Sequence, residues 1–210
     1  MPVEIQYMPS IISSSVLAQT ISWGEYYATA KKYVESEDRP DLYQNEKMQR
    51  YTSENIKRMD HILQTIHIES KLYNALSAIH TDMVWLVLTE PWCGDASQVV
   101  PVLHTIASCT ERVDFRILQS DLHPEILSAY LTDGSRSIPK LICLKADTLD
   151  EIGTWGPRPA ALHQIVQAHK DDMSISFGAK VRMVHEWYDT DKTASIQDEF
   201  IDLIKKWSAN

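Results

Sequence analysis

An apolar run that ends at a proline and is followed by Trp-Cys-Gly is the feature that most constrains how this chain can fold. Residues 83–88 read Met-Val-Trp-Leu-Val-Leu, which favours a buried strand, and Pro91 ends the run. Helical spacing begins at about Gly94. Cys93 is therefore expected where a buried strand meets a helix N-terminus. Unpaired backbone N–H groups and the helix dipole favour a thiolate at that position.

This site has one sulfur. A second cysteine three residues later would complete a dithiol redox centre, but that position is Ala96. Cys93 is the candidate catalytic nucleophile: at an exposed helix N-terminus it would attack a disulfide and stop at a mixed disulfide until an external thiol releases it. The alternative is a structural cysteine in a fold that has lost this chemistry.

The landmarks around Cys93 resemble thioredoxin, whose active site is a Trp-Cys-Gly run between a buried strand and a helix. Pro101 follows Cys93 by eight residues, as a helix-kinking proline does in thioredoxin. Residues 134–139, Gly-Ser-Arg-Ser-Ile-Pro, resemble the segment that carries thioredoxin's cis-proline. The chain is most similar to a thioredoxin-like branch, mainly bacterial, that reads Trp-Cys-Gly-Asp-Ala and Ser-Ile-Pro-Lys. The resemblance covers about residues 82–169.

The resemblance implies an α/β fold, with a thioredoxin-like mixed sheet sandwiched by helices and helical additions at both ends. It implies that Pro139 is cis, faces the reactive sulfur and offers backbone groups to an incoming peptide. A turn proline without a functional role is the alternative, since most X–Pro bonds are trans. The substrate-binding residues that it implies are Trp92, Gly94, Asp95, Ser137, Ile138 and Pro139.

Several positions depart from the thioredoxin pattern. Val87 stands where thioredoxin buries an aspartate that serves its second cysteine, which argues against thioredoxin's own reductase cycle. Asp95 replaces a proline, and its charge would oppose a thiolate two residues away, although it is also a favourable first-turn residue. Arg136 and Lys140 flank Pro139 and could receive the carboxylates of a small thiol, or they are ordinary solvated loop charges.

Three zones follow one another along the chain, which together form one structural domain. Residues 1–81 are expected to be an N-terminal helical extension packed on the core. Within it, Ser22 and Glu25 form a capping box that begins a helix through about Val34. This extension covers the sheet or, alternatively, provides a docking platform. Residues 82–169 are the thioredoxin-like core, and residues 170–210 are a C-terminal addition with two helical patterns. The expected core strands are 83–89, 114–118, 138–144 and 149–154, the last two in a hairpin, with helices at 94–108, 124–131 and from about 157–160.

The composition and charge of the chain exclude some classes of binding partner. A formal charge of −9 and a pI near 5.3 argue against nucleic acid or an anionic membrane as the main partner. No apolar run reaches the roughly 18 residues that span a bilayer, and residues 1–5 lack a basic signal-peptide region. Three cysteines fit a reducing compartment, by default the cytoplasm. Cys109 and Cys143 are expected in the core.

No motif for a metal, nucleotide or other cofactor is present, so none is predicted. The preferred function is a single-cysteine thiol–disulfide oxidoreductase acting on a protein or a low-molecular-weight thiol or disulfide. The alternative is a non-catalytic binding module that uses the surface of Trp92 and Pro139 together with the added helices. A peroxidase ranks third, because the Thr and Arg that peroxiredoxins place around their cysteine are not apparent.

Overall fold

A computed structural model describes residues 11–209 of the chain; the N-terminal residues on which the signal-peptide expectation rests lie outside them. A mixed four-stranded sheet has the order β2-β1-β3-β4. Its strands are β1 (Met83–Thr89), β2 (Val113–Gln119), β3 (Lys140–Lys145) and β4 (Glu151–Trp155). β1 is parallel to β2 and antiparallel to β3, and β3 and β4 form the predicted antiparallel hairpin. The predicted thioredoxin-like α/β fold is confirmed.

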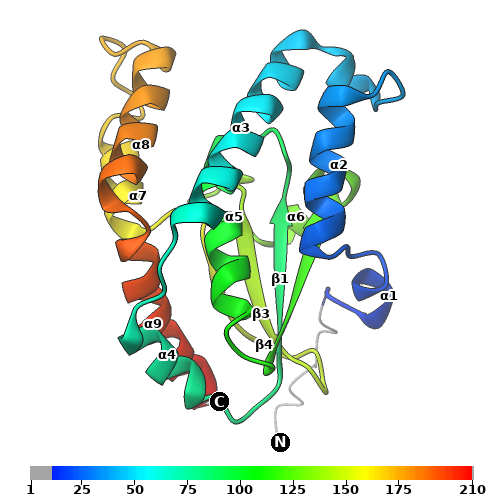
Figure 1. The fold of residues 1–210 in the computed structure, drawn as a ribbon, viewed down its shortest axis with the longest axis vertical. Coiled ribbons are helices and arrows are strands. Elements are labelled where there is room, and N and C mark those ends of the chain that lie inside the picture. Colours follow the sequence, from blue (N-terminus) through cyan, green and yellow to red (C-terminus); the bar gives the residue numbers. More distant parts are fainter. Residues whose placement is uncertain (1–10, 210) are drawn as a thin grey trace, which may run out of the picture.

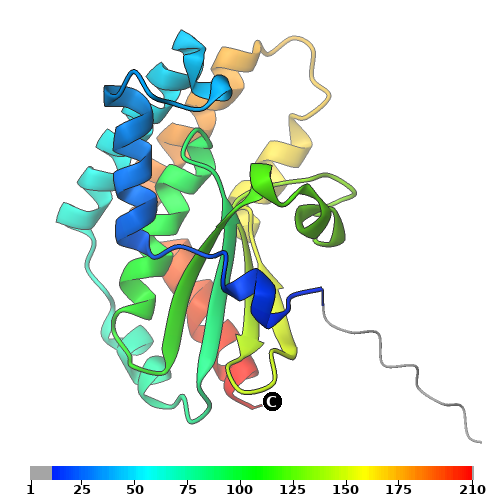
Figure 2. The same cartoon turned by 90° about the vertical axis from the view of Figure 1, so that its right-hand side faces the viewer.

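Helices surround this sheet, and both chain ends add helices to it (Figures 1 and 2). One face carries α2, α3, α5 and α9, and the short helices α1 and α6 lie on the other side. The helices are α1 (Ser14–Leu17), α2 (Trp23–Glu35), α3 (Glu46–Thr65), α4 (Ser70–Ser77), α5 (Gly94–Ala107), α6 (Pro124–Ala129), α7 (Ala160–Ala168), α8 (Phe177–Asp191) and α9 (Ala194–Ser208), with short 3-10 turns η1 (Asp41–Gln44) and η2 (Ser120–Leu122).

Strand β1 is the centre of the core and leads directly to the candidate site. All seven of its residues are buried, because it has a strand on each edge and helices over its faces. α5 begins five residues after β1 ends and contains Pro101 within its length. The junction between β1 and α5 is thus a rigid, buried support for Cys93.

Helix α9 closes the sheet from the C-terminal end of the chain. Its Phe200 and Trp207 rings pack against Trp85 of β1, with centroids 5.1 and 5.9 Å away. A side chain at Gly153 of β4 would meet Trp207 Nε1 at 2.4 Å, so this position needs a glycine. The C-terminal addition is therefore part of the same hydrophobic core as the sheet.

The N-terminal addition is joined to the core in the same way. The predicted capping box forms, with the Ser22 hydroxyl accepting from the Glu25 backbone N–H and the Glu25 carboxylate accepting from Ser22 N–H. Ile21 pairs with Ile117 at the outer edge of β2. Gln197 of α9 accepts a hydrogen bond from the Glu69 backbone N–H at 2.9 Å, which ties α9 to the start of α4. Across residues 11–209, no helix combines the length and apolar character that crossing a bilayer requires.

Candidate active site

Cys93 is the N-cap residue of α5 and lies beside the Ile138–Pro139 peptide. The Cys93 thiol donates a hydrogen bond to the Ile138 carbonyl oxygen at 3.4 Å. The peptide bond from Ile138 to Pro139 is cis. The sequence places these residues far apart, and the sheet brings them together because β1 and β3 are neighbours.

The thiol is buried, and the prediction of an exposed helix N-terminus is wrong in this respect. Cys93 is only 8% exposed. Burial, together with the charge of Asp95, raises the pKa of the Cys93 thiol to about 12, although backbone N–H groups of Asp95 and Ala96 favour the thiolate. Desolvation therefore outweighs the helix N-terminus, and the thiol is neutral at physiological pH in this conformation.

Asp95 is paired with a residue from the other end of the core. The Arg158 guanidinium donates two hydrogen bonds to its carboxylate, from Nε at 2.9 Å and from a terminal nitrogen at 2.6 Å. The Tyr188 hydroxyl of α8 donates a third, at 3.1 Å. Arg158 follows β4, so three separate elements meet at the first turn of α5. The Asp95 carboxylate is thus a junction between the active-site helix and the C-terminal addition.

A buried amide supports the backbone that carries Cys93. Asn55 of α3 donates hydrogen bonds from Nδ2 to the carbonyl oxygens of Pro91 and Cys93, at 2.8 and 3.1 Å. Arg58 donates to Asn55 Oδ1 at 2.8 Å, which fixes the orientation of the amide. Helix α3 therefore holds the turn between β1 and α5 in place.

Helix α8 covers the start of α5. A Cβ built on Gly94 would lie 3.5 Å from the His185 imidazole, so the ring is in van der Waals range of the residue after Cys93. Gln98 Nε2 lies 3.5 Å from His185 Nδ1. Burial and the nearby positive charge of Arg58 lower the pKa of His185. A neutral imidazole thus packs over the first turn of α5.

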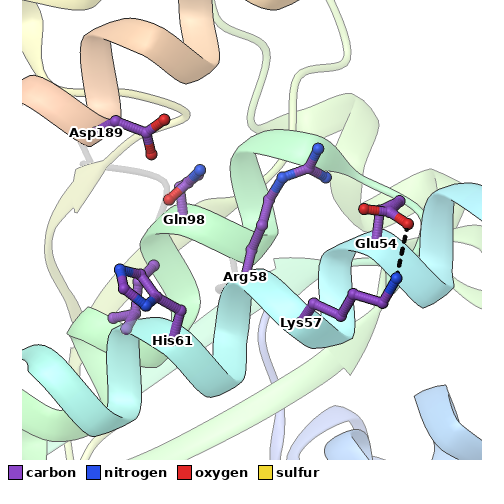
Figure 3. Close-up of a pocket in the computed structure, with 7 residues that line it drawn as sticks. Glu54, Lys57, Arg58, His61, Gln98 and Asp189 are labelled. Carbon is purple, nitrogen blue, oxygen red and sulfur yellow. Dashed lines mark hydrogen bonds and ion pairs between the residues drawn. The ribbon is translucent and has the colours of Figure 1, made fainter.

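A polar cavity of about 180 Å³ lies between α3, α5 and α8 (Figure 3). Arg58 and Gln98 line it from α3 and α5, and Asp189 lines it from α8. Glu54 and Lys57, which form an ion pair at 3.0 Å, border it on the α3 side. Because its lining is mostly charged or polar, α8 is not packed against α3 by an apolar seam here.

A second buried acid lies just before the active-site turn. Glu90 is 2% exposed and accepts a hydrogen bond from the Asp121 backbone N–H at 2.7 Å. Burial raises its pKa to about 7. The Asp121 side chain accepts from the Trp92 indole N–H at 3.1 Å, which holds Trp92 at the mouth of the site. Glu90 and Trp92 are thus both hydrogen-bonded to Asp121, which lies in the 3-10 turn η2.

The predicted site residues around Pro139 differ in how far they are buried. Ser137 is half-buried and Ile138 is buried next to Pro139. β3 begins at Lys140, two residues later than predicted, because residues 138–139 form the turn that faces Cys93.

The two charged residues that flank Pro139 differ in exposure. Arg136 is exposed, whereas Lys140 is 8% exposed, so the interpretation of both as solvated loop charges is wrong for Lys140. Its ammonium reaches the Thr132 hydroxyl at 3.3 Å, and burial lowers its pKa.

Cys143 is fully buried in β3, as a core cysteine. Cys109 is only half-buried at the end of α5, so the prediction of a core position is wrong for it. The reason is that α5 ends at Ala107, which leaves Cys109 in the turn beyond the helix. Within residues 11–209, no group of three or more His, Cys, Asp and Glu side chains is arranged to hold a metal ion.

Sequence reasoning missed Asn55, Arg158, His185 and Tyr188. A signal for Asn55 exists, because it falls on the same face of α3 as the buried Met59 and Ile62. A polar side chain on such a face must find buried partners. No comparable signal pairs Arg158 or Tyr188 with Asp95, since they are 63 and 93 residues away.

A family model and one solved structure agree with this architecture. The sequence model of a family described as thioredoxin matches residues 41–173, and so includes α3 as well as the predicted core. A crystal structure of a protein of unknown function from Pseudomonas aeruginosa has a TM-score of 0.60 and 14% identity, covering 93% of this chain and 98% of that one. A crystal structure of an HIV epitope scaffold has a TM-score of 0.48 and 17% identity over 88% of this chain and 98% of that chain. No curated protein sequence matches.

Proposed function

Because the chain belongs to the thioredoxin family, we propose that it is a single-cysteine thiol–disulfide oxidoreductase that works through a mixed disulfide at Cys93. The observation that carries the proposal is the position of Cys93 at the N-terminus of α5, with its sulfur 3.4 Å from the carbonyl oxygen that precedes Pro139. Backbone groups next to the sulfur suit the binding of a disulfide-bearing substrate. The surfaces of Trp92, Gly94, Asp95, Ser137, Ile138 and Pro139 would bind it.

The chemistry needs two exchange steps. The Cys93 thiol loses its proton to solvent, and the thiolate attacks one sulfur of a disulfide. A bond forms between Cys93 and that sulfur, and the other sulfur leaves as a thiolate, which carries away two electrons. An external thiolate then attacks the substrate sulfur of the mixed disulfide and bonds to it, and Cys93 leaves as the thiolate with the electron pair of the broken bond. Ala96 supplies no internal resolving group, so the second thiol comes from solution.

One observation favours a second candidate, a non-catalytic binding module. Burial raises the pKa of Cys93 to about 12, so the thiol is protonated at pH 7 in this conformation. An oxidoreductase must therefore expose the sulfur to water before it reacts, which restores a more ordinary thiol pKa. A binding module has no such requirement and would use the Trp92 and Pro139 surface with the added helices.

The setting of this activity is also proposed. Three free cysteines suit a reducing compartment, and we place the protein in the cytoplasm, without a cofactor, nucleic acid or membrane partner. The Trp92-to-Ala96 motif and the Ser137-to-Lys140 segment favour the mainly bacterial branch that shares them. We treat residues 1–81 and 170–210 as additions that form one domain with the core.

Mixed-disulfide formation tests the proposal. A Cys109→Ser/Cys143→Ser variant leaves Cys93 as the one cysteine, and glutathione disulfide is the probe. The expected result is a single glutathione adduct in the intact mass, which an excess of reduced thiol removes. A variant that also carries Cys93→Ser is the control and should gain no mass. Absence of the adduct in the folded protein, with adduct formation after denaturation, would favour the binding module.

A further inference from the structure

Helix α8 contacts the active-site turn through two side chains, neither of which belongs to the thioredoxin-like motifs. His185 lies over Gly94, and the Tyr188 hydroxyl binds Asp95 at 3.1 Å. Gly94 and Asp95 are the two residues that follow Cys93 in the chain. Tyr188 is buried. α8 thus covers the side of the turn on which α5 begins.

Two further groups lie beside Cys93. The Ile138 carbonyl lies 3.4 Å from Cys93 Sγ, and Trp92 is held by its hydrogen bond to Asp121. In this setting Cys93 itself is only 8% exposed. Disulfide exchange needs the attacking sulfur to approach the two sulfurs of its target along one line. A disulfide on a bulky surface needs more open space around Cys93 than this exposure provides, and α8 contacts the two residues that follow Cys93.

The contacts of α8 permit a small displacement more readily than a complete release. On its α3 side, α8 borders the polar cavity of about 180 Å³ lined by Arg58, Gln98 and Asp189 (Figure 3). A polar cavity that water can enter lets a helix shift without breaking an apolar core. At its C-terminal end, α8 is followed closely by α9, whose Phe200 and Trp207 are fixed against Trp85. The helix is therefore tethered to the core at its C-terminal end and bordered by a polar cavity on its α3 side.

We propose that α8, through His185 and Tyr188, restricts Cys93 to low-molecular-weight thiols and disulfides and excludes the disulfides of folded proteins. This inference rests on the proposed function and selects one of its two substrate classes. His185 and Tyr188 are specificity-determining residues, since they touch the active-site turn and take no part in the exchange itself. A shift of α8 by the size of a side chain would admit a small disulfide, and a protein surface would require removal of the helix.

Two disulfide reagents of different size, each used separately, test the proposal in the variant that keeps only Cys93. The rate of mixed-disulfide formation is measured with glutathione disulfide and with insulin. The parent should react at least about 100-fold faster with glutathione disulfide. His185→Ala should raise the insulin rate about tenfold or more and the glutathione rate less than about threefold, and Tyr188→Phe should act in the same direction. Glu186→Ala, at an exposed position of the same helix, is the matched control and should leave both rates unchanged.

The outcomes separate the two proposals. Similar parent rates with both reagents would overturn the size restriction while leaving the oxidoreductase intact. An equal rise of both rates in His185→Ala would also overturn it, because α8 would then hinder small and large disulfides to the same extent. If neither reagent modifies Cys93 in the parent or in either α8 variant, although the unfolded chain reacts, the proposed function fails and the restriction fails with it.

Discussion

The Asp95 carboxylate and the Arg158 guanidinium meet in a two-hydrogen-bond ion pair, at 2.9 and 2.6 Å, next to the cysteine of the candidate active site. The side chains are 11% and 22% exposed, so the pair is largely shielded from water. Asp95 opposes a thiolate at Cys93 and Arg158 favours one. The pair therefore reduces the electrostatic cost that the unusual aspartate imposes on the sulfur.

Loss of Arg158 should make the Cys93 thiol less acidic. Arg158→Met leaves the Asp95 charge without its partner, so the pKa of Cys93 should rise, and the free energy of unfolding should fall by about 3 kcal/mol. Asp95→Asn in addition should reverse most of both effects, because no unpaired charge remains. The pH dependence of iodoacetamide alkylation and urea unfolding measure the two quantities. Arg116→Met, which breaks the exposed pair with Asp114, is the control and should cost less than about 1 kcal/mol. A lower Cys93 pKa in Arg158→Met would contradict this account.

Truncation of Asn55 should loosen the turn that carries Cys93. Asn55→Ala removes hydrogen bonds to the carbonyl oxygens of Pro91 and Cys93 and leaves both acceptors buried, so a loss of about 2 kcal/mol is expected. Urea unfolding gives this value, and amide hydrogen exchange of residues 92–94 should increase locally. Lys57→Ala, on the exposed face of the same helix, should change stability by less than about 0.5 kcal/mol. Equal stabilities of the two variants would refute a supporting role for Asn55.

The parts of the fold that follow local rules were predictable, and the packing of the additions was not. The continuous apolar run gave strand β1 within its observed limits, and Ser22 with Glu25 marked the start of α2. The cis bond before Pro139 rested on resemblance alone, because no local rule selects that isomer. The amphipathic pattern of α8 indicated a helix without specifying which surface it covers. The burial of Cys93 depends on packing between segments that are distant in the sequence, such as the Ile138 carbonyl beside its sulfur, which explains why an exposed thiol was expected.

Glu90 should make the protein less stable as the pH rises. Its folded-state pKa is raised by burial from 4.5 to about 7, so the fold favours the protonated acid. The corresponding stabilisation is complete below pH 4.5 and is lost as the pH rises through 7, a change of about 3 kcal/mol. Glu90→Gln retains an acceptor for the Asp121 N–H and should remove this slope. Urea unfolding at pH 5 and pH 8 measures it, with the exposed Glu111→Gln as a control that keeps the wild-type slope. An unchanged slope in Glu90→Gln would show that other groups cause it.

A second cysteine at position 96 should convert the site into a dithiol centre. Ala96 lies in the first turn of α5, three residues after Cys93, and is fully buried. Ala96→Cys should therefore form an internal disulfide with Cys93 on mild oxidation, detected as a loss of two hydrogens in the intact mass. Disulfide reductase activity should rise above that of the parent but remain partial, because Val87 supplies no proton acceptor. Ala107→Cys, at the far end of the same helix, should form no such disulfide. Two free thiols at positions 93 and 96 after oxidation would contradict the thioredoxin-like geometry of the turn.

Cys93 is expected to react from the folded protein after a local opening. The direct test is the rate of iodoacetamide alkylation of Cys93 as a function of urea concentration, in the variant that lacks Cys109 and Cys143. A local displacement of α8 exposes little surface, so we expect alkylation well below the unfolding transition, with a urea dependence less than about half the slope of global unfolding. Alkylation that proceeds only through global unfolding, with the same urea slope, would contradict the claim and identify Cys93 as a structural residue.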